Sequence, residues 1–141
     1  MSSKVGWLVE GRVIFVETEN EVSIDELHDI NNFIADLMEQ ADVPLVHVIA
    51  YNHAAKIPLN IIQLQKVSRP VQGHPRNGWN IFVSDNNGLV DFAMNAVSQV
   101  FKTRWRKVSS FEEALSFLQS VDQSLPALPL NPDPEVLRSF N

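Results

Sequence analysis

The run Val43–Ala50, which reads VPLVHVIA, restricts the possible folds of this 141-residue chain more than any other segment. It is almost entirely apolar and rich in β-branched residues, which is typical of a strand buried on both faces of a sheet. Pro58 follows it at a position that suits the first turn of a helix, where a missing N–H needs no partner. We therefore predict a central strand at Val43–Ala50, a loop at Tyr51–Ile57 and a helix at Pro58–Val67.

The other elements follow from the spacing of apolar residues and from turn chemistry. Glu10 and Gly11 separate two alternating runs, which predicts a β-hairpin. Ser23 and Ser110 each begin a capping-box pattern in front of a helical stripe. Further strands are predicted at Gly6–Val9, Arg12–Thr18, Trp79–Ser84 and Arg104–Val108, and further helices at 23–41, 89–101 and 110–121.

The order β-β-α-β-α-β-α-β-α predicts an α/β fold. Alternating strands and helices of this length are typical of a mostly parallel sheet with right-handed crossovers. We expect a mixed five-stranded sheet with about four helices, in which the opening hairpin supplies an antiparallel strand. Charged residues on both sides of Trp105 suit the edge of this sheet.

The C-terminal segment differs from the rest of the chain. It contains Pro126, Pro129, Pro132 and Pro134, which disfavour regular structure, together with several leucines. We therefore divide the chain into an α/β domain at 1–122 and a proline-rich arm at 123–141. The arm is predicted to lie on its own domain or on a second copy, with a disordered tail as the alternative.

Composition excludes several classes of protein. Cysteine is absent, which excludes disulfides, thiolate catalysis and Cys-ligated metal sites. No segment approaches the roughly 18 apolar residues that a membrane span needs, and the N-terminus lacks a secretion signal, so we expect a cytoplasmic protein. The net charge is −6, yet no acid lies between Asp42 and Asp85. Such a division of charge is typical of solvated helix faces and could also steer a partner.

The element order, the chain length and the closing stretch Trp105–Leu118 (WRKVSSFEEALSFL) resemble the SpoIIAA-like, or STAS, fold family. In that family the last strand is likewise followed by a short capped helix with an EEAL-type sequence. The resemblance covers about residues 6–122.

The resemblance implies a non-enzymatic interaction or regulatory domain. Phosphorylatable members carry an Asp-Ser type motif after the strand that matches Val43–Ala50. Here the window Tyr51–Ile57 reads YNHAAKI and contains no Ser or Thr, so the phosphoserine switch does not carry over. The related SEC14-like fold binds lipids, which leaves a small-molecule or lipid-binding domain as the alternative function.

Two strand-exit loops, at 51–57 and 84–88, are the predicted ligand site, because ligands of such sheets bind beyond the carboxyl ends of the strands. His53 and Lys56 could hold an anionic or lipid ligand with help from exposed amides at the next helix. The candidate ligand-binding residues are Tyr51, Asn52, His53, Lys56, Ser84, Asp85 and Gly88.

The remaining chemistry is sparse. His47 lies mid-strand without a paired ligand, which favours a satisfied core imidazole over a metal site. Trp105 alternates with Arg104 and Arg106, so these residues cannot form a stacking platform for nucleic acid. The chain carries no hydrolase or metalloprotease motif. We therefore expect no catalytic residue, metal or cofactor, and no nucleic-acid partner.

Strand alternation suggests a partner of another kind. Val46, Val48 and Ala50 point to one face of the sheet and Leu45, His47, Ile49 and Tyr51 to the other. We group Ile81 and Val83 with the first, aliphatic face and expect it to lie under the helices. If the second face is only half covered, its apolar residues favour a homodimer, with another protein as the alternative partner. The candidate interface residues are Phe15, Leu45, Phe82, Leu128, Leu130 and Phe140.

Overall fold

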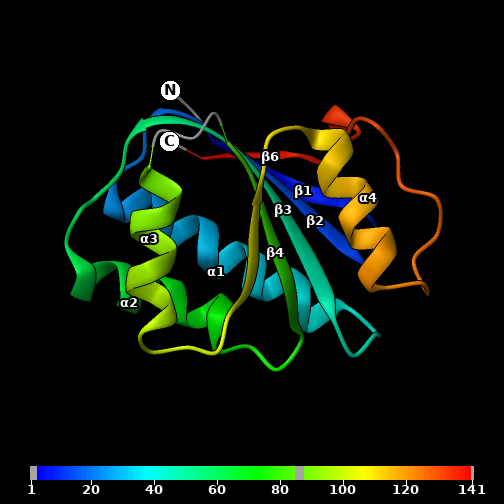
Figure 1. Cartoon of the computed structure of the whole chain (residues 1–141), viewed down its shortest axis with the longest axis horizontal. Helices are drawn as coiled ribbons and strands as arrows, with labels where there is room; N and C mark the ends of the chain where they lie inside the picture. Colours follow the sequence, from blue (N-terminus) through cyan, green and yellow to red (C-terminus); the bar gives the residue numbers. More distant parts are fainter. Residues whose placement is uncertain (1–2, 85–87, 141) are drawn as a thin grey trace.

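A six-stranded sheet in the order β5-β4-β3-β2-β1-β6 forms the frame of the molecule (Figure 1). The computed structural model describes residues 3–84 and 88–140. The strands are β1 (Ser3–Val9), β2 (Val13–Glu21), β3 (Val46–Lys56), β4 (Asn77–Ser84), β5 (Arg104–Val108) and β6 (Arg138–Phe140). The helices are α1 (Ile24–Gln40), α2 (Ile61–Gln72), α3 (Leu89–Ser98) and α4 (Phe111–Val121), with a 3₁₀ turn η1 at Pro134–Val136.

The predicted α/β fold is confirmed. Strands β2, β3, β4 and β5 pair in parallel, and β1 pairs with β2 in the antiparallel direction. The hairpin turns at Gly11, whose φ of 75° suits glycine, and the Arg12 N–H donates to the Val9 carbonyl at 2.9 Å. Strand β3 lies inside the sheet, as its apolar sequence predicts, but it begins at Val46 rather than Val43. Strand β5 lies at one edge.

The strand count of five is wrong, because the C-terminal segment supplies a sixth strand. Arg138–Phe140 pairs antiparallel with β1, with Ser3 opposite Phe140. All four prolines of the segment precede this strand, so none of them removes a donor from its ladder. Leu125, Leu128 and Leu137 pack against the core that the sheet forms with α4, so the segment lies on its own domain.

The predicted loop at Tyr51–Ile57 is also wrong over most of its length. Strand β3 continues to Lys56 because β2 runs equally far and pairs with it, from Glu17 opposite Tyr51 to Glu21 opposite Lys56. The Val22 N–H then donates to the Lys56 carbonyl at 3.0 Å. Backbone pairing with a polar neighbouring strand here outweighs the weak strand propensity of Asn52 and His53.

Two helices, α2 and α3, differ from the prediction in their boundaries. Helix α2 begins at Ile61, because the side chain of Asn60 accepts from the Gln63 N–H at 3.0 Å and caps it there. It continues through Pro70, which lies in the last turn before Gly73. Helix α3 ends at Ser98 rather than Phe101, where the backbone changes to turn hydrogen bonds.

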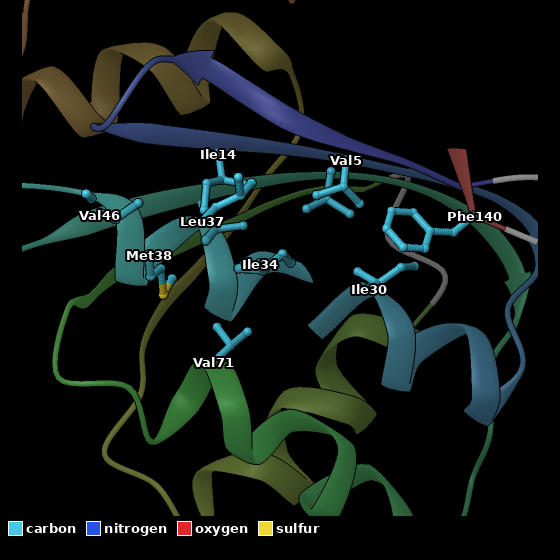
Figure 2. Packing of buried hydrophobic residues seen from close by; sticks show 12 residues of the cluster. Val5, Ile14, Ile30, Ile34, Leu37, Met38, Val46, Val71 and Phe140 are labelled. Atoms are coloured by element: carbon cyan, nitrogen blue, oxygen red, sulfur yellow. The ribbon is translucent and has the colours of Figure 1, made fainter. Parts of the chain in front are cut away.

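Helices cover both faces of the sheet, but unequally. Figure 1 shows α1, α2 and α3 on one side and α4 on the other, where the C-terminal segment also lies. On the three-helix side, Val5 and Ile14 of the sheet point toward Ile34 and Leu37 of α1, with Val71 of α2 beyond them (Figure 2). The opposite side has a second core, formed by Phe15, Ile49, Ile81, Val83, Val108, Ala114, Leu115 and Leu118 among others.

The predicted faces are right for β3 and wrong for β4. Val46 and Val48 lie under α1, whereas Ile49 lies under α4. The register between β3 and β4 shifts at this point: Val46 pairs with Asn77 but Val48 pairs with Asn80. The extra residue in β4 turns Ile81 and Val83 toward α4 and Phe82 toward α3, opposite to the expected assignment.

None of the helices in the described part of the chain combines the length and the apolar content that crossing a membrane requires.

Candidate functional site

An apolar cavity of about 170 Å3 lies between the sheet and helices α1, α2 and α3, which cover one of its faces. We call it the α2 cavity, because α2 packs between α1 and α3 and forms its roof. The sheet contributes the floor and each helix contributes apolar side chains. The central lining residues are Val16, Val48, Ala50 and Phe82 from the sheet, Ile30 and Ile34 from α1, Leu64 and Val71 from α2, and Met94 and Val97 from α3.

Polar side chains stand around this cavity, and most of them bind one another. Gln72 Nε2 donates to Asn80 Oδ1 at 3.3 Å, Asn80 Nδ2 donates to Asn77 Oδ1 at 2.9 Å, and Asn77 Nδ2 donates to Gln72 Oε1 at 3.1 Å. Toward the carboxyl ends of the strands, Thr18 Oγ1 donates to Asn52 Oδ1 at 2.9 Å. Because these groups satisfy each other, the cavity mainly offers apolar surface to a ligand.

The predicted ligand-binding residues do not form one group. Because β3 stays extended, Asn52 lines the α2 cavity while Tyr51 and His53 point to the α4 side. There the His53 ring stacks on Tyr51 with centroids 4.4 Å apart, and His53 Nε2 lies 3.6 Å from Glu17 Oε2. Lys56 is exposed at the end of β3.

The second predicted loop is only partly described. Ser84 is buried at the end of β4, opposite Asn52 in the register. Gly88 precedes α3 with a φ of 85°, a left-handed conformation that glycine adopts without strain. Asp85 lies outside the described residues. Of the two loops, the structure therefore brings Asn52 and Ser84 side by side.

The predicted interface residues are also dispersed. Phe15 is buried, with its ring 5.9 Å from that of Phe111 in an edge-to-face contact, and Phe140 is buried against Phe33. Phe82 packs against α3, and Leu45 and Leu128 are half-buried. Leu130 is 66% exposed. Helix α4 and the C-terminal segment cover the face from which a homodimer was inferred, so the homodimer stays a prediction.

A His–Asp–Ser cluster lies at the other end of β3. His47 Nε2 lies 2.8 Å from Asp122 Oδ2, and His47 Nδ1 accepts from the Trp79 backbone N–H at 2.9 Å. The second bond fixes the tautomer, so Nε2 carries the proton and donates it to Asp122. Ser124 Oγ donates to Asp122 Oδ1 at 2.6 Å and does not contact the imidazole. His47 is therefore a buried and satisfied core residue, as the sequence predicts.

The electrostatics of the cluster match this geometry. Burial lowers the pKa of His47 below its ordinary 6.5, although the bond to Asp122 acts in the opposite direction. Burial acts to raise the pKa of Asp122, but the hydrogen bonds from Ser124 and His47 outweigh it and lower that pKa to about 2. The resting state is therefore a neutral imidazole that donates to a carboxylate.

The sequence did not predict the cavity, because the residues that line it have the spacing of ordinary core residues. Ile30 and Ile34 belong to the amphipathic stripe of α1, and Leu64 and Val71 belong to that of α2. Apolar residues at helical spacing predict burial but not how closely two buried surfaces approach. One signal did exist: Asn52, Asn80 and Gln72 are polar residues in a lining that is mainly apolar.

The comparisons with known proteins concern the fold. No family model matches the chain, and no curated protein matches it. The chain is similar to a solved structure, that of an uncharacterized protein of the DUF3478 family from Shewanella loihica PV-4, which has a SpoIIAA-like fold. The TM-score is 0.56, and the match covers 75% of this chain and 83% of that chain at 7% sequence identity. The chain therefore has a SpoIIAA-like fold, in a form that has diverged far in sequence.

Proposed function

We propose that the protein is a non-enzymatic binding domain that takes up a small apolar molecule in the α2 cavity. The observation that supports this is the cavity itself, about 170 Å3 lined mainly by aliphatic side chains. An apolar cavity of about 150 Å3 in another protein stays free of water and binds benzene. A ring of that size or a short alkyl chain fits the volume, with Asn52 and Ser68 as polar neighbours at its edge.

The arrangement of the His–Asp–Ser cluster supports the non-enzymatic part of the proposal. In a hydrolytic triad the histidine stands between the serine and the carboxylate and takes the serine proton. Here Asp122 stands between Ser124 and His47, and the second ring nitrogen of His47 is bonded to the backbone. Neither nitrogen is free to act as a general base.

Ligand uptake gives a route to regulation through α2. The inner face of this helix lines the cavity through Leu64 and Val71, and its outer face carries Ile62, which is 65% exposed. Leu59, just before the helix, is 62% exposed. A ligand that fixes α2 against the sheet is expected to change how this apolar outer face meets another protein. A homodimer and a cytoplasmic location remain predictions from the sequence.

Benzene titration tests the cavity. Met94 lines the cavity, whereas Met38, fully buried on α1, does not. We expect benzene to shift the 13C-methyl resonance of Met94 in a saturable manner and to leave that of Met38 nearly unchanged. Equal shifts of both methyl groups would contradict specific uptake. Native mass spectrometry of protein purified from cells then reports any retained natural ligand.

A matched pair of variants makes the test specific. Ala93 lines the cavity from α3, and Ala35 is a similarly half-buried alanine on α1 that does not line it. Ala93→Leu fills the cavity and is expected to abolish the benzene shift, whereas Ala35→Leu is expected to preserve it. If both variants bind benzene like the wild type, the ligand lies elsewhere and the proposed function is wrong.

A further inference from the structure

A second hollow, of about 520 Å3, opens at the amino ends of the parallel strands, away from both predicted loops. Arg12 stands just before β2, Leu45 just before β3, Trp79 lies within β4 and Arg104 begins β5. Because these strands are adjacent, residues 92 positions apart in the chain line one groove. We call it the Arg12–Arg104 groove. Its volume falls in the range of about 300–1,000 Å3 that is usual for small-molecule sites.

Two guanidinium groups give the groove an excess of positive charge. Arg104 is exposed, and its Nη1 donates to the Asn77 carbonyl at 3.4 Å. No carboxylate in residues 3–84 and 88–140 forms an ion pair with it. Arg12 binds Ser124 through both terminal nitrogens, at 3.3 and 2.5 Å, and its buried Nε has no hydrogen-bond partner among the same residues.

The carboxylate of Asp122 also lines the groove but is largely occupied. Its oxygens accept from His47, from Ser124 Oγ and from the Ser124 N–H, and Arg12 Nη2 lies 3.8 Å from Oδ2. His47 is neutral, so two guanidinium charges face one carboxylate charge. One positive charge remains, and Arg104 carries it, since none of the described carboxylates pairs with it. Guanidinium groups bind carboxylates through two parallel hydrogen bonds, which favours this type of ligand.

The remaining walls of the groove are apolar. Pro44 is exposed, Leu45 is half-buried and Val121 is 41% exposed. Trp79 is half-buried and is held by an edge-to-face contact with Phe117, with centroids 4.9 Å apart. An indole fixed in this way presents a flat surface that loses little freedom when a ligand binds. These walls suit a ligand with an apolar body, which inorganic anions lack.

We propose that the Arg12–Arg104 groove binds a small organic carboxylate, whose anionic group lies against Arg104 and Arg12 and whose apolar body lies against Trp79 and Leu45. This site is separate from the α2 cavity: β3 passes between them, with His47 at the floor of the groove and Asn52 in the wall of the cavity. The two proposed sites are therefore tested by separate experiments, and failure of one does not affect the other.

Benzoate is the probe, and the indole N–H resonance of Trp79, assigned with Trp79→Phe, is the readout. The titration replaces sodium chloride with sodium benzoate at constant ionic strength, so that general screening is unchanged. We expect a saturable shift of the Trp79 resonance. The absence of a saturable shift up to about 10 mM benzoate would overturn the proposal.

Arg106 supplies the matched control for Arg104. Both arginines lie on β5 and point to the same face, but the Arg106 guanidinium lies 4.7 Å from the Phe117 ring centroid and does not line the groove. Loss of a charge-assisted hydrogen bond predicts that Arg104→Gln weakens benzoate binding about tenfold or more. Arg106→Gln is expected to change it less than twofold, about the level of an exposed charge. Equal effects of the two variants would refute a specific role for Arg104.

Two further ligands test the arginine contacts and the apolar wall separately. Benzamide has the shape of benzoate without its charge and is expected to bind about tenfold or more weakly, since the charge-assisted bonds are lost. Inorganic phosphate has charge without an apolar body and is expected to leave the Trp79 resonance nearly unchanged. Benzamide binding as tightly as benzoate would contradict the arginine contacts, and phosphate binding as tightly would contradict the apolar wall.

Discussion

The backbone of Gly78 lies directly against the imidazole of His47: a Cβ on Gly78 would stand 2.5 Å from Nδ1 and 3.1 Å from the Val46 carbonyl oxygen. The ring cannot move away, because both of its nitrogens are hydrogen-bonded. We therefore expect Gly78→Ala to lower the free energy of unfolding by about 2 kcal/mol, as overpacking of a core does. Urea denaturation measures this change.

A double-mutant cycle checks the cause. The His47→Ala variant lacks the imidazole that a Cβ on Gly78 would contact. In this background Gly78→Ala should lower the free energy of unfolding by no more than half as much, and the remaining loss comes mainly from the contact with Val46. If Gly78→Ala lowers the free energy of unfolding equally in both backgrounds, the contact with the imidazole is not the reason why glycine is required at position 78.

His47 is expected to make the protein less stable as the pH drops below about 6.5. Its pKa is lowered by burial in the folded state, so near pH 6 the unfolded chain binds more protons at this residue than the folded one. The stabilisation is complete above the ordinary pKa of 6.5 and is lost as the pH falls toward the lowered value. The Asp122 contribution is lost only below its ordinary 3.8, toward about 2.

Urea unfolding between about pH 7.5 and about pH 5.5 measures the His47 contribution. At about pH 7.5, His47→Gln should have a lower free energy of unfolding than the wild type. Between about pH 7.5 and about pH 5.5 that free energy should fall less in the variant than in the wild type. His28→Gln, which changes an exposed histidine on α1, is the control and should keep the wild-type slope. A wild-type slope in His47→Gln would assign the pH dependence to other groups.

Strand β6 is expected to contribute strongly to stability through Phe140. This side chain is 8% exposed and its ring lies 5.5 Å from that of Phe33 on α1. Phe140→Ala should lower the free energy of unfolding by about 3 kcal/mol. Leu130→Ala is the matched control from the same segment and should change it by less than about 0.5 kcal/mol. Similar losses in both variants would mean that exposure does not distinguish these residues in solution.

The buried pair of Ser3 and Glu26 joins β1 to α1. Ser3 Oγ donates to Glu26 Oε2, and both residues are buried. Ser3→Ala leaves this carboxylate without its donor and is expected to cost about 2 kcal/mol. Glu26→Gln keeps a carbonyl acceptor and should cost less. Chemical denaturation at pH 7 compares the free energies of unfolding of Ser3→Ala and Glu26→Gln. A larger decrease in Glu26→Gln would show that the charge of Glu26 contributes more to stability than its hydrogen bond with Ser3.

Sequence patterns predicted the elements that depend on local rules. Ser23 accepts from the Glu26 N–H at 3.1 Å and begins α1 as its capping pattern indicates, although the Glu26 side chain binds Ser3 instead of the cap. Val46–Ala50 of the run VPLVHVIA lies in the middle of the sheet, because a strand with two apolar faces needs cover on both.

Features that depend on pairing could not be predicted in this way. The shift between Val48 and Asn80 reverses the faces of β4, and nothing in either strand alone reveals its partner's register. The continuation of β3 to Lys56 needs β2 beside it. The α2 cavity depends on how far α2 stands from the sheet, and the Arg12–Arg104 groove depends on residues that only the folded sheet brings together.

The outermost strands of the described sheet limit how copies of this protein can assemble. Strand β6 has three residues, and β5 carries Arg104, Arg106 and Lys107. A short strand and a row of like charges both disfavour backbone pairing between molecules. Growth into an extended intermolecular sheet, the usual beginning of fibril formation, is therefore disfavoured at both edges, so any self-association is expected to use other surfaces.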